Sequence, residues 1–241
     1  MRAETTIKEA LERDGYALLR GVFSAEEIAG MRDEATALLA TESRTVNGGL
    51  VHGPAPRDSA LARRLLDDGR LAFPCSDEFP CEVHIHANTY NYWHVDLPAP
   101  DCPVDGAPPW MYKTVIYLQD HPDRDGISIA ASSHREGNRP RAPSHVSTRA
   151  GDIVIFDLRV RHAGQLPNWV LGEFAWLQHR LGLVGKRGYH VFRLQRLLRP
   201  APATPRLALF LLFARHKEIG PKYAAWRASL TRCGGGFARA T

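Results

Sequence analysis

Apolar and polar positions in the first forty residues follow two helical patterns. Thr6 with Glu9, and Ser24 with Glu27, have the spacing of a capping box at the start of a helix. The first helix is expected to stop at Gly15, and a short strand is expected directly after this glycine. The second helix carries an apolar stripe at helical spacing, formed by Ile28, Met31, Ala35, Leu38 and Leu39.

The pattern changes after residue 40. Residues 41–57 are rich in Gly, Pro and polar side chains and are interpreted as a loop, followed by a short helix over 59–68. Extended patterns bounded by Pro, Gly and Asp clusters then predict strands at 82–90, 111–118, 126–130, 152–156 and 206–213.

These segments predict one domain over residues 1–241, mainly β with flanking helices. The helical part covers about 1–75, and an antiparallel β core covers about 80–215. Residues 169–199 combine apolar positions with many arginines, and we interpret them as an insertion in the core.

Composition narrows the class of protein only slightly. An apolar fraction of 44% and a charged fraction of 24% are ordinary for a globular chain and argue against disorder. The formal net charge of +5 is compatible with an anionic small molecule as substrate. Basic and aromatic residues are not interleaved as stacking on nucleic acid requires, so no nucleic-acid partner is expected.

Cysteine spacing and apolar runs bear on the cell compartment. None of the four cysteines has the two-residue spacing of a structural zinc site, so reduced thiols are expected. The N-terminal stretch is too polar for a signal peptide, and the longest apolar run, 207–214, is too short to span a bilayer. We therefore expect a cytoplasmic protein without a membrane partner.

The sharpest chemical signal is a pair of ligand-type residues, His94 and Asp96. Residues two apart on a strand point to the same face, so an imidazole and a carboxylate can bind one ion there. His162 follows an apolar strand and is the candidate third ligand. Two histidines and one carboxylate on one face of a metal are typical of non-haem iron(II) oxygenases. His84 and His86 form a competing pair of the cupin type.

An ordered set of motifs resembles the phytanoyl-CoA dioxygenase family of Fe(II)- and 2-oxoglutarate-dependent dioxygenases. Ser132 stands where the family's turn usually has Gly, and Ile127 replaces a second Gly. The motifs run through most of the chain: DGYALLRGVFS (14–24), WHVD (93–96), TVIYLQD (114–120), DGISIAASSHREG (125–137), GDIVIFD (151–157) and HAG (162–164).

The resemblance implies a double-stranded β-helix, or jelly-roll core, with Fe(II) on His94, Asp96 and His162. Members use O₂ to oxidise an unactivated C–H bond while 2-oxoglutarate becomes succinate and CO₂. Because Asp96 is a carboxylate, the halogenase variant of this chemistry is disfavoured.

The cosubstrate also needs a cation for its distal carboxylate, and a guanidinium suits it through two parallel hydrogen bonds. The resemblance places this arginine at the opening of the last core strand, where Arg206 stands. Arg206 lies further past His162 than is usual in the family, and the insertion would explain the gap. Arg180 and Arg193 are the competitors.

Weaker predictions concern other polar and aromatic positions. Lys113 or Thr114 is expected to reach the cosubstrate's other carboxylate. The alternation over 82–88 makes one face of that strand polar, which favours either a pocket wall, with Asn88 near the cosubstrate, or a surface edge. Candidate substrate contacts, each also compatible with a structural role, are His86, Trp93 and Trp110.

Three functions of different classes remain compatible with the sequence. The first is an Fe(II)/2-oxoglutarate oxygenase that hydroxylates a small metabolite, with desaturation or ring closure as variants. The second is a cupin-like metal-binding jelly roll without oxygenase activity. The third is a basic binding module whose histidines are structural. The substrate itself is set by variable loops, and the sequence does not identify it.

Overall fold

The computed structural model describes residues 2–46, 49–53, 59–71, 79–89, 91–96, 111–122, 126–135, 144–164, 205–214 and 225. The helical elements are α1 (Arg2–Asp14), α2 (Ala25–Thr41), α3 (Ala60–Leu66) and a 3₁₀ turn, η1 (Gly69–Leu71). The strands are β1 (Tyr16–Leu19), β2 (Arg44–Val46), β3 (Gly49–His52), β4 (Phe79–Ala87), β5 (Asn91–His94), β6 (Met111–Tyr117), β7 (Ile127–Ile129), β8 (Ser144–Val146), β9 (Ile153–Asp157), β10 (His162–Gly164) and β11 (Leu207–Ala214).

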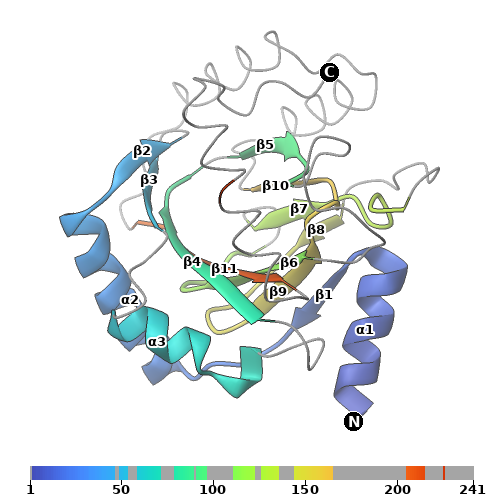
Figure 1. The fold of residues 1–241 in the computed structure, drawn as a ribbon, viewed down its shortest axis with the longest axis horizontal. Coiled ribbons are helices and arrows are strands. Elements are labelled where there is room, and N and C mark those ends of the chain that lie inside the picture. The colour runs from blue at the N-terminus through green and yellow to red at the C-terminus, as the bar shows by residue number, and fades with distance from the viewer. Residues whose placement is uncertain are drawn as a thin grey trace, which may run out of the picture.

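These strands form two antiparallel sheets. The larger has seven strands in the order β1-β9-β6-β11-β4-β3-β2, and the smaller has four in the order β5-β10-β7-β8. Figure 1 shows the strands of the smaller sheet grouped above β6, β9 and β11, with α2 and α3 at the lower left. The predicted mainly-β fold with a double-stranded β-helix core is confirmed.

The larger sheet separates two apolar clusters because its side chains alternate between its faces. Its outer face, with residues such as Ile85, Ile116 and Leu209, packs against Met31 and Leu65 from the helices. Burying each large aliphatic side chain there contributes roughly 1.5–3 kcal/mol. The inner face packs against the smaller sheet through Val115, Tyr117, Val154, Phe156, Ala208, Ile127, Ile129 and Val146.

The predicted helix starts and ends in the N-terminal part are confirmed in some cases and wrong in one. Ser24 and Glu27 form the predicted capping box at the start of α2, and Ser59 caps α3. Thr6 and Glu9 do not start a helix, since α1 begins at Arg2 and both lie inside it. The helix ends as predicted before Gly15, whose φ of +79° suits glycine.

The prediction that residues 41–57 form a loop is wrong. β2 and β3 lie in this segment and pair as a hairpin, and β3 also pairs with β4. Three short strands of the smaller sheet, β5, β8 and β10, were also not predicted as such. Among the helices that the structure describes, none combines the length and apolar character that a membrane crossing needs.

Asp152 holds the approach to β9 in place. Its carboxylate accepts hydrogen bonds from the backbone amides of Gly21 and Arg149, each at 2.8 Å, and from the Arg20 guanidinium at 2.6 Å. Burial opposes ionisation, but the amides of Arg149 and Gly21 together with Arg20 outweigh it, so the pKa of Asp152 lies below its ordinary value. The ionised side chain therefore ties β1 to the turn before β9.

Replacing Asp152 with Asn is expected to lower the free energy of unfolding by about 1–3 kcal/mol at neutral pH, because buried amides lose a charged acceptor. Since the pKa of Asp152 is lowered on folding, its contribution is complete above the ordinary value of 3.8 and disappears as pH falls through the folded value. Urea unfolding of both proteins at several pH values tests this. Arg20→Ala is the control and should cost less, since that side chain is 56% exposed. If Asp152→Asn lowered the free energy of unfolding equally at every pH, the stabilising role of the ionised carboxylate would be contradicted.

The structure accounts for the serine at position 132, where the motif that the sequence resembles usually has glycine. Its φ is +64°, a left-handed conformation in which glycine is the usual residue. The serine hydroxyl donates a hydrogen bond to the Arg13 carbonyl at 2.9 Å, and its amide donates to the Asp14 carbonyl at 2.8 Å. The hydroxyl bond offsets the strain that a side chain brings to this turn.

We expect Ser132→Ala to be less stable than the parent by about 1 kcal/mol, because it keeps the strain and loses the hydroxyl bond. Ser132→Gly loses the same bond but relieves the strain, so its stability should stay close to that of the parent. Urea denaturation of the three proteins measures the difference. A glycine variant less stable than the alanine variant would show that the turn is not strained.

Candidate metal centre

Strand pairing brings two distant histidines together. His94 is the last residue of β5 and pairs directly with His162, the first residue of β10. Residues directly opposite on antiparallel strands present their side chains on the same face. Their imidazole rings accordingly lie 4.3 Å apart between centroids. β10 also pairs with β7, so His162 is held between two neighbouring strands.

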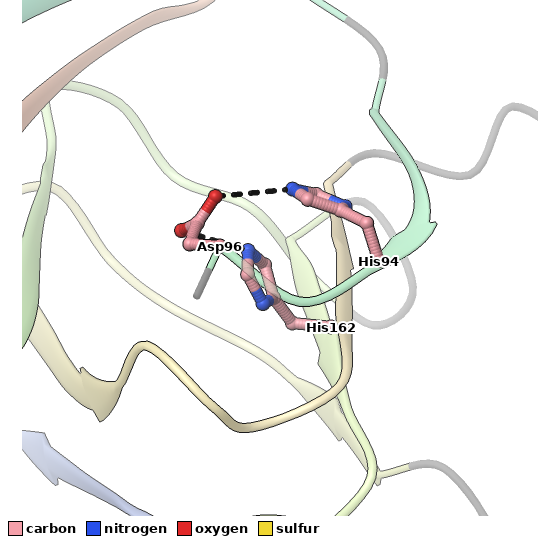
Figure 2. Close-up of side chains that lie close together, drawn as sticks. All are labelled: His94, Asp96 and His162. Carbon is pink, nitrogen blue, oxygen red and sulfur yellow. Dashed lines mark ion pairs between the residues drawn. The ribbon is translucent and has the colours of Figure 1, made fainter. Parts of the chain in front are cut away.

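Asp96 completes the group from the segment that follows β5. Its backbone amide donates to the Leu158 carbonyl at 2.9 Å, which ties it to the turn between β9 and β10. One carboxylate oxygen, Oδ1, lies 3.5 Å from Nε2 of His94, and the other, Oδ2, lies 3.5 Å from Nε2 of His162. Figure 2 shows the carboxylate facing both imidazoles.

Electrostatics keep these side chains in the forms that bind metal. Burial opposes ionisation of Asp96, but the charge of Lys113 and the two imidazoles outweigh it, so the pKa of this carboxyl lies well below its ordinary value. Burial, followed by the charge of His94, lowers the pKa of His162 to about 3. Asp96 is therefore ionised and His162 neutral at physiological pH, as metal ligation requires.

The orientation of His162 also suits a ligand. Its Nδ1 lies 3.0 Å from the Val160 carbonyl, and because a carbonyl can only accept, this nitrogen carries the hydrogen. The lone pair is then on Nε2, the atom that faces Asp96. Such a bond fixes both ring orientation and tautomer in metal-binding histidines.

The three residues fit one metal ion. Each offers one ligand atom, and these atoms all lie within 4.8 Å of one another. Ligands at right angles around an ion with bonds of about 2.1 Å stand about 3 Å apart, so small side-chain movements suffice. Two imidazoles and one carboxylate suit iron, and three protein ligands leave coordination positions open.

Lys113 stands beside this group from the facing sheet. Its Nζ lies 2.5 Å from Oδ2 of Asp96, which sequence reasoning did not foresee. The signal available was a single charged residue in a strand whose other residues are uncharged. Thr114 lies on the opposite face of β6, since its partners Leu211 and Ile155 belong to the outer cluster. Of this predicted pair, the structure places only Lys113 at the ligand group.

His84 and His86 lie on the inner face of β4, where they pair with Phe210 and Ala208. The ring of His86 lies 4.3 Å from that of Phe210, centroid to centroid. The polar face of β4 therefore does not lie at a surface edge. Among the described residues, neither histidine belongs to a group that could hold a metal. A substrate contact of His86 stays a prediction.

Asn88 and Arg206 lie at the end of the inner face that is opposite to Lys113. The Asn88 side chain accepts from the Arg206 amide at 2.8 Å, and the Asn88 amide donates to the Arg206 carbonyl at 2.9 Å. Asn88 thus fixes the backbone where β11 begins, and its contact with the cosubstrate stays a prediction. Arg206 continues the alternation of Ala208 and Phe210, which face inward.

Of the two predicted tryptophans, the structure describes Trp93 and not Trp110. Trp93 is buried, and as the strand neighbour of His94 it is directed away from the ligand group. Its role as a substrate contact stays a prediction. The remaining predicted positions, Trp110, Arg180, Arg193 and the insertion at 169–199, lie outside the described residues.

Comparison with known proteins finds no matching family model. The chain is 26% identical over 201 residues to an ectoine dioxygenase from Sphingopyxis alaskensis. The match covers 74% of this chain. The chain spans 63% of the length of that relative.

Solved structures share the fold. The epimerase SnoN from nogalamycin biosynthesis, in complex with Fe3+, alpha ketoglutarate and nogalamycin RO, matches with a TM-score of 0.60 and 18% identity. That match covers 88% of this chain and 84% of SnoN. HygX from Streptomyces hygroscopicus, with nickel, 2-oxoglutarate and hygromycin B bound, matches with a TM-score of 0.59 and 16% identity over 89% of this chain and 87% of HygX.

We expect His94→Ala, His162→Ala and Asp96→Asn each to weaken Ni(II) binding by more than about 100-fold, because each removes a direct ligand. Calorimetric titration of the metal-free proteins measures this. His145→Ala is the matched control, since His145 lies on β8 and contacts Ser128 rather than the ligand group. Unchanged affinity in two of the three ligand variants would place the metal elsewhere.

Proposed function

We propose that this chain is an Fe(II)- and 2-oxoglutarate-dependent oxygenase that hydroxylates a small-molecule metabolite. The observation that carries the proposal is the group formed by His94, Asp96 and His162 inside a double-stranded β-helix. The motif order that resembles the phytanoyl-CoA dioxygenase family supports it, as does similarity to the ectoine dioxygenase. A cytoplasmic location is part of the proposal.

In this function the three ligands would hold Fe(II), with 2-oxoglutarate and O₂ on the open side. The bound iron and cosubstrate supply the oxidation of a C–H bond, with release of succinate and CO₂. The chain contributes the environment for this chemistry. Phe156 lies against His162 with ring centroids 4.5 Å apart, which excludes water from one side of the ligand group.

Two cations on the inner face can receive the cosubstrate's carboxylates. Lys113 pairs in register with Leu212 of β11, and Arg206 lies six positions earlier along the same strand, or roughly 20 Å. Lys113 is thus at the metal end and Arg206 at the far end. We propose that Arg206 extends inward to the distal carboxylate, while Lys113 serves the carboxylate next to the metal.

The substrate is proposed to be a small molecule rather than a nucleic acid or membrane. The related structures with nogalamycin RO and hygromycin B bound support this class. The net charge of +5 is compatible with an anionic group on the substrate. Hydroxylation is the proposed reaction, and product analysis distinguishes it from desaturation and ring closure.

The second candidate is a metal-binding jelly roll without oxygenase activity. Imidazole and carboxylate ligands also suit zinc, so the ligand group alone does not require redox chemistry. A protein that binds metal but forms no succinate from 2-oxoglutarate with any of a broad panel of metabolites would be of this kind.

The experiment that tests the proposal is an anaerobic titration of the Fe(II)-loaded protein with 2-oxoglutarate, following the visible metal-to-ligand charge-transfer band. The band should form in the parent and be lost in His94→Ala. Arg206→Ala should need at least about tenfold more cosubstrate, because a charged hydrogen bond is lost. Arg44→Ala, an exposed arginine on β2, is the control. No band in the iron-loaded parent would overturn the proposal, and an unchanged Arg206→Ala titration would overturn that assignment alone.

A further inference from the structure

Lys113 occupies an unusual place for a lysine. It lies on the inner face of β6 with a side chain only 17% exposed. Its Nζ lies 6.0 Å from the centre of the Phe156 ring and 5.6 Å from that of Phe210. An ammonium group beside two aromatic rings and largely removed from water requires an anionic partner, and Asp96 supplies it at 2.5 Å.

The contact involves an atom that the metal also needs. Oδ2 of Asp96 faces both Lys113 and Nε2 of His162, while Oδ1 faces His94. A metal ion held by the three ligands would therefore share this small carboxylate with a neighbouring ammonium. The two cations would repel each other strongly, because both side chains of the pair are largely buried and water screens charges there only weakly.

We infer that Lys113 is an internal counter-cation of Asp96: a positioning residue that competes with the metal for the carboxylate and makes metal binding depend on the anionic cosubstrate. This inference rests on the proposed function, because it assigns the metal and 2-oxoglutarate to the same group.

The charges of the group give the physical reason. With neutral imidazoles, Asp96 and Lys113 sum to zero, so a divalent metal brings the group to about +2. A doubly charged 2-oxoglutarate anion restores neutrality. Without the lysine, the metal-bound group would carry about +1 and the dianion would leave it negative. Lys113 should therefore weaken binding of the metal alone and strengthen binding of the dianion to the metal-bound protein.

The geometry allows Lys113 to keep both partners. An ammonium group has three hydrogen-bond donors, so the bond to Asp96 leaves others for a carboxylate bound next to the metal. Since coupling between two ligands is reciprocal, the cosubstrate should tighten metal binding by the same factor as the metal tightens cosubstrate binding.

The test compares the parent with Lys113→Met, which keeps the chain length and removes the charge. Ni(II) affinity is measured by calorimetry without and with saturating 2-oxoglutarate. Lys113→Met should bind Ni(II) alone at least about tenfold tighter, because no ammonium then repels the metal or shares Oδ2 of Asp96 with it. The factor by which 2-oxoglutarate tightens Ni(II) binding should be smaller than in the parent.

Two controls isolate the role of position from that of charge. Lys113→Arg keeps a cation beside Asp96 and should behave like the parent. Lys8→Met removes an exposed lysine of α1 and should leave both affinities unchanged. Equal Ni(II) affinity and equal tightening by 2-oxoglutarate in the parent and Lys113→Met would overturn the inference, as would weaker Ni(II) binding in Lys113→Met.

A second measurement separates this inference from the proposed function. In the presence of a chelator, Lys113→Met should unfold at a lower temperature than the parent, since Asp96 loses its buried partner. The double variant Lys113→Met with Asp96→Asn should recover much of that loss. A parent that binds no Ni(II) even with saturating 2-oxoglutarate would overturn the proposed function. A Lys113→Met variant as stable as the parent, or one not recovered by Asp96→Asn, would overturn the counter-cation role.

Discussion

The antiparallel pairing of β10 with β5 determines the geometry of the whole site. It sets His162 directly opposite His94, although 67 residues separate them along the chain. The register then shifts, because two steps from His162 to Gly164 correspond to three steps from His94 to Asn91. An extra residue of this kind bends a strand and redirects its side chains, and such bulges are frequent beside active sites. Asp96, anchored to the Leu158 carbonyl, depends on the same strand ends.

Local patterns predicted the elements whose causes are local. The capping box of Ser24 and Glu27 requires only neighbouring residues, so its helix start was readable from the sequence. The hairpin of β2 and β3 was missed because its strands have three and four residues and lie among glycines, where pairing with β4 rather than apolar alternation makes them extended. β5, β8 and β10 were missed because strands of three or four residues are too short to show an alternating pattern.

The three candidate ligand residues could be predicted because their chemistry is distinctive, but their surroundings could not. Neither the bond from Lys113 to Asp96 nor the tilted ring contact of Phe156 with His162 follows from spacing, since both cross from one sheet to the other. Alternation alone also left Lys113 and Thr114 equivalent. Only the register of β6 with β9 and β11 shows which of the two faces inward.

The two faces of the larger sheet differ in what they can tolerate. The outer face is closed by helices, and among the residues that the structure describes the buried Thr114 hydroxyl on this face has no hydrogen-bond partner. The inner face instead carries Lys113 and His86 beside the Phe210 ring, and His84 directly opposite Phe210 on the neighbouring strand. Polar side chains inside a core cost stability unless they pair with one another or with a ligand. Their concentration on the one face that meets the metal group is therefore best explained by binding, because packing alone would favour apolar residues at these positions.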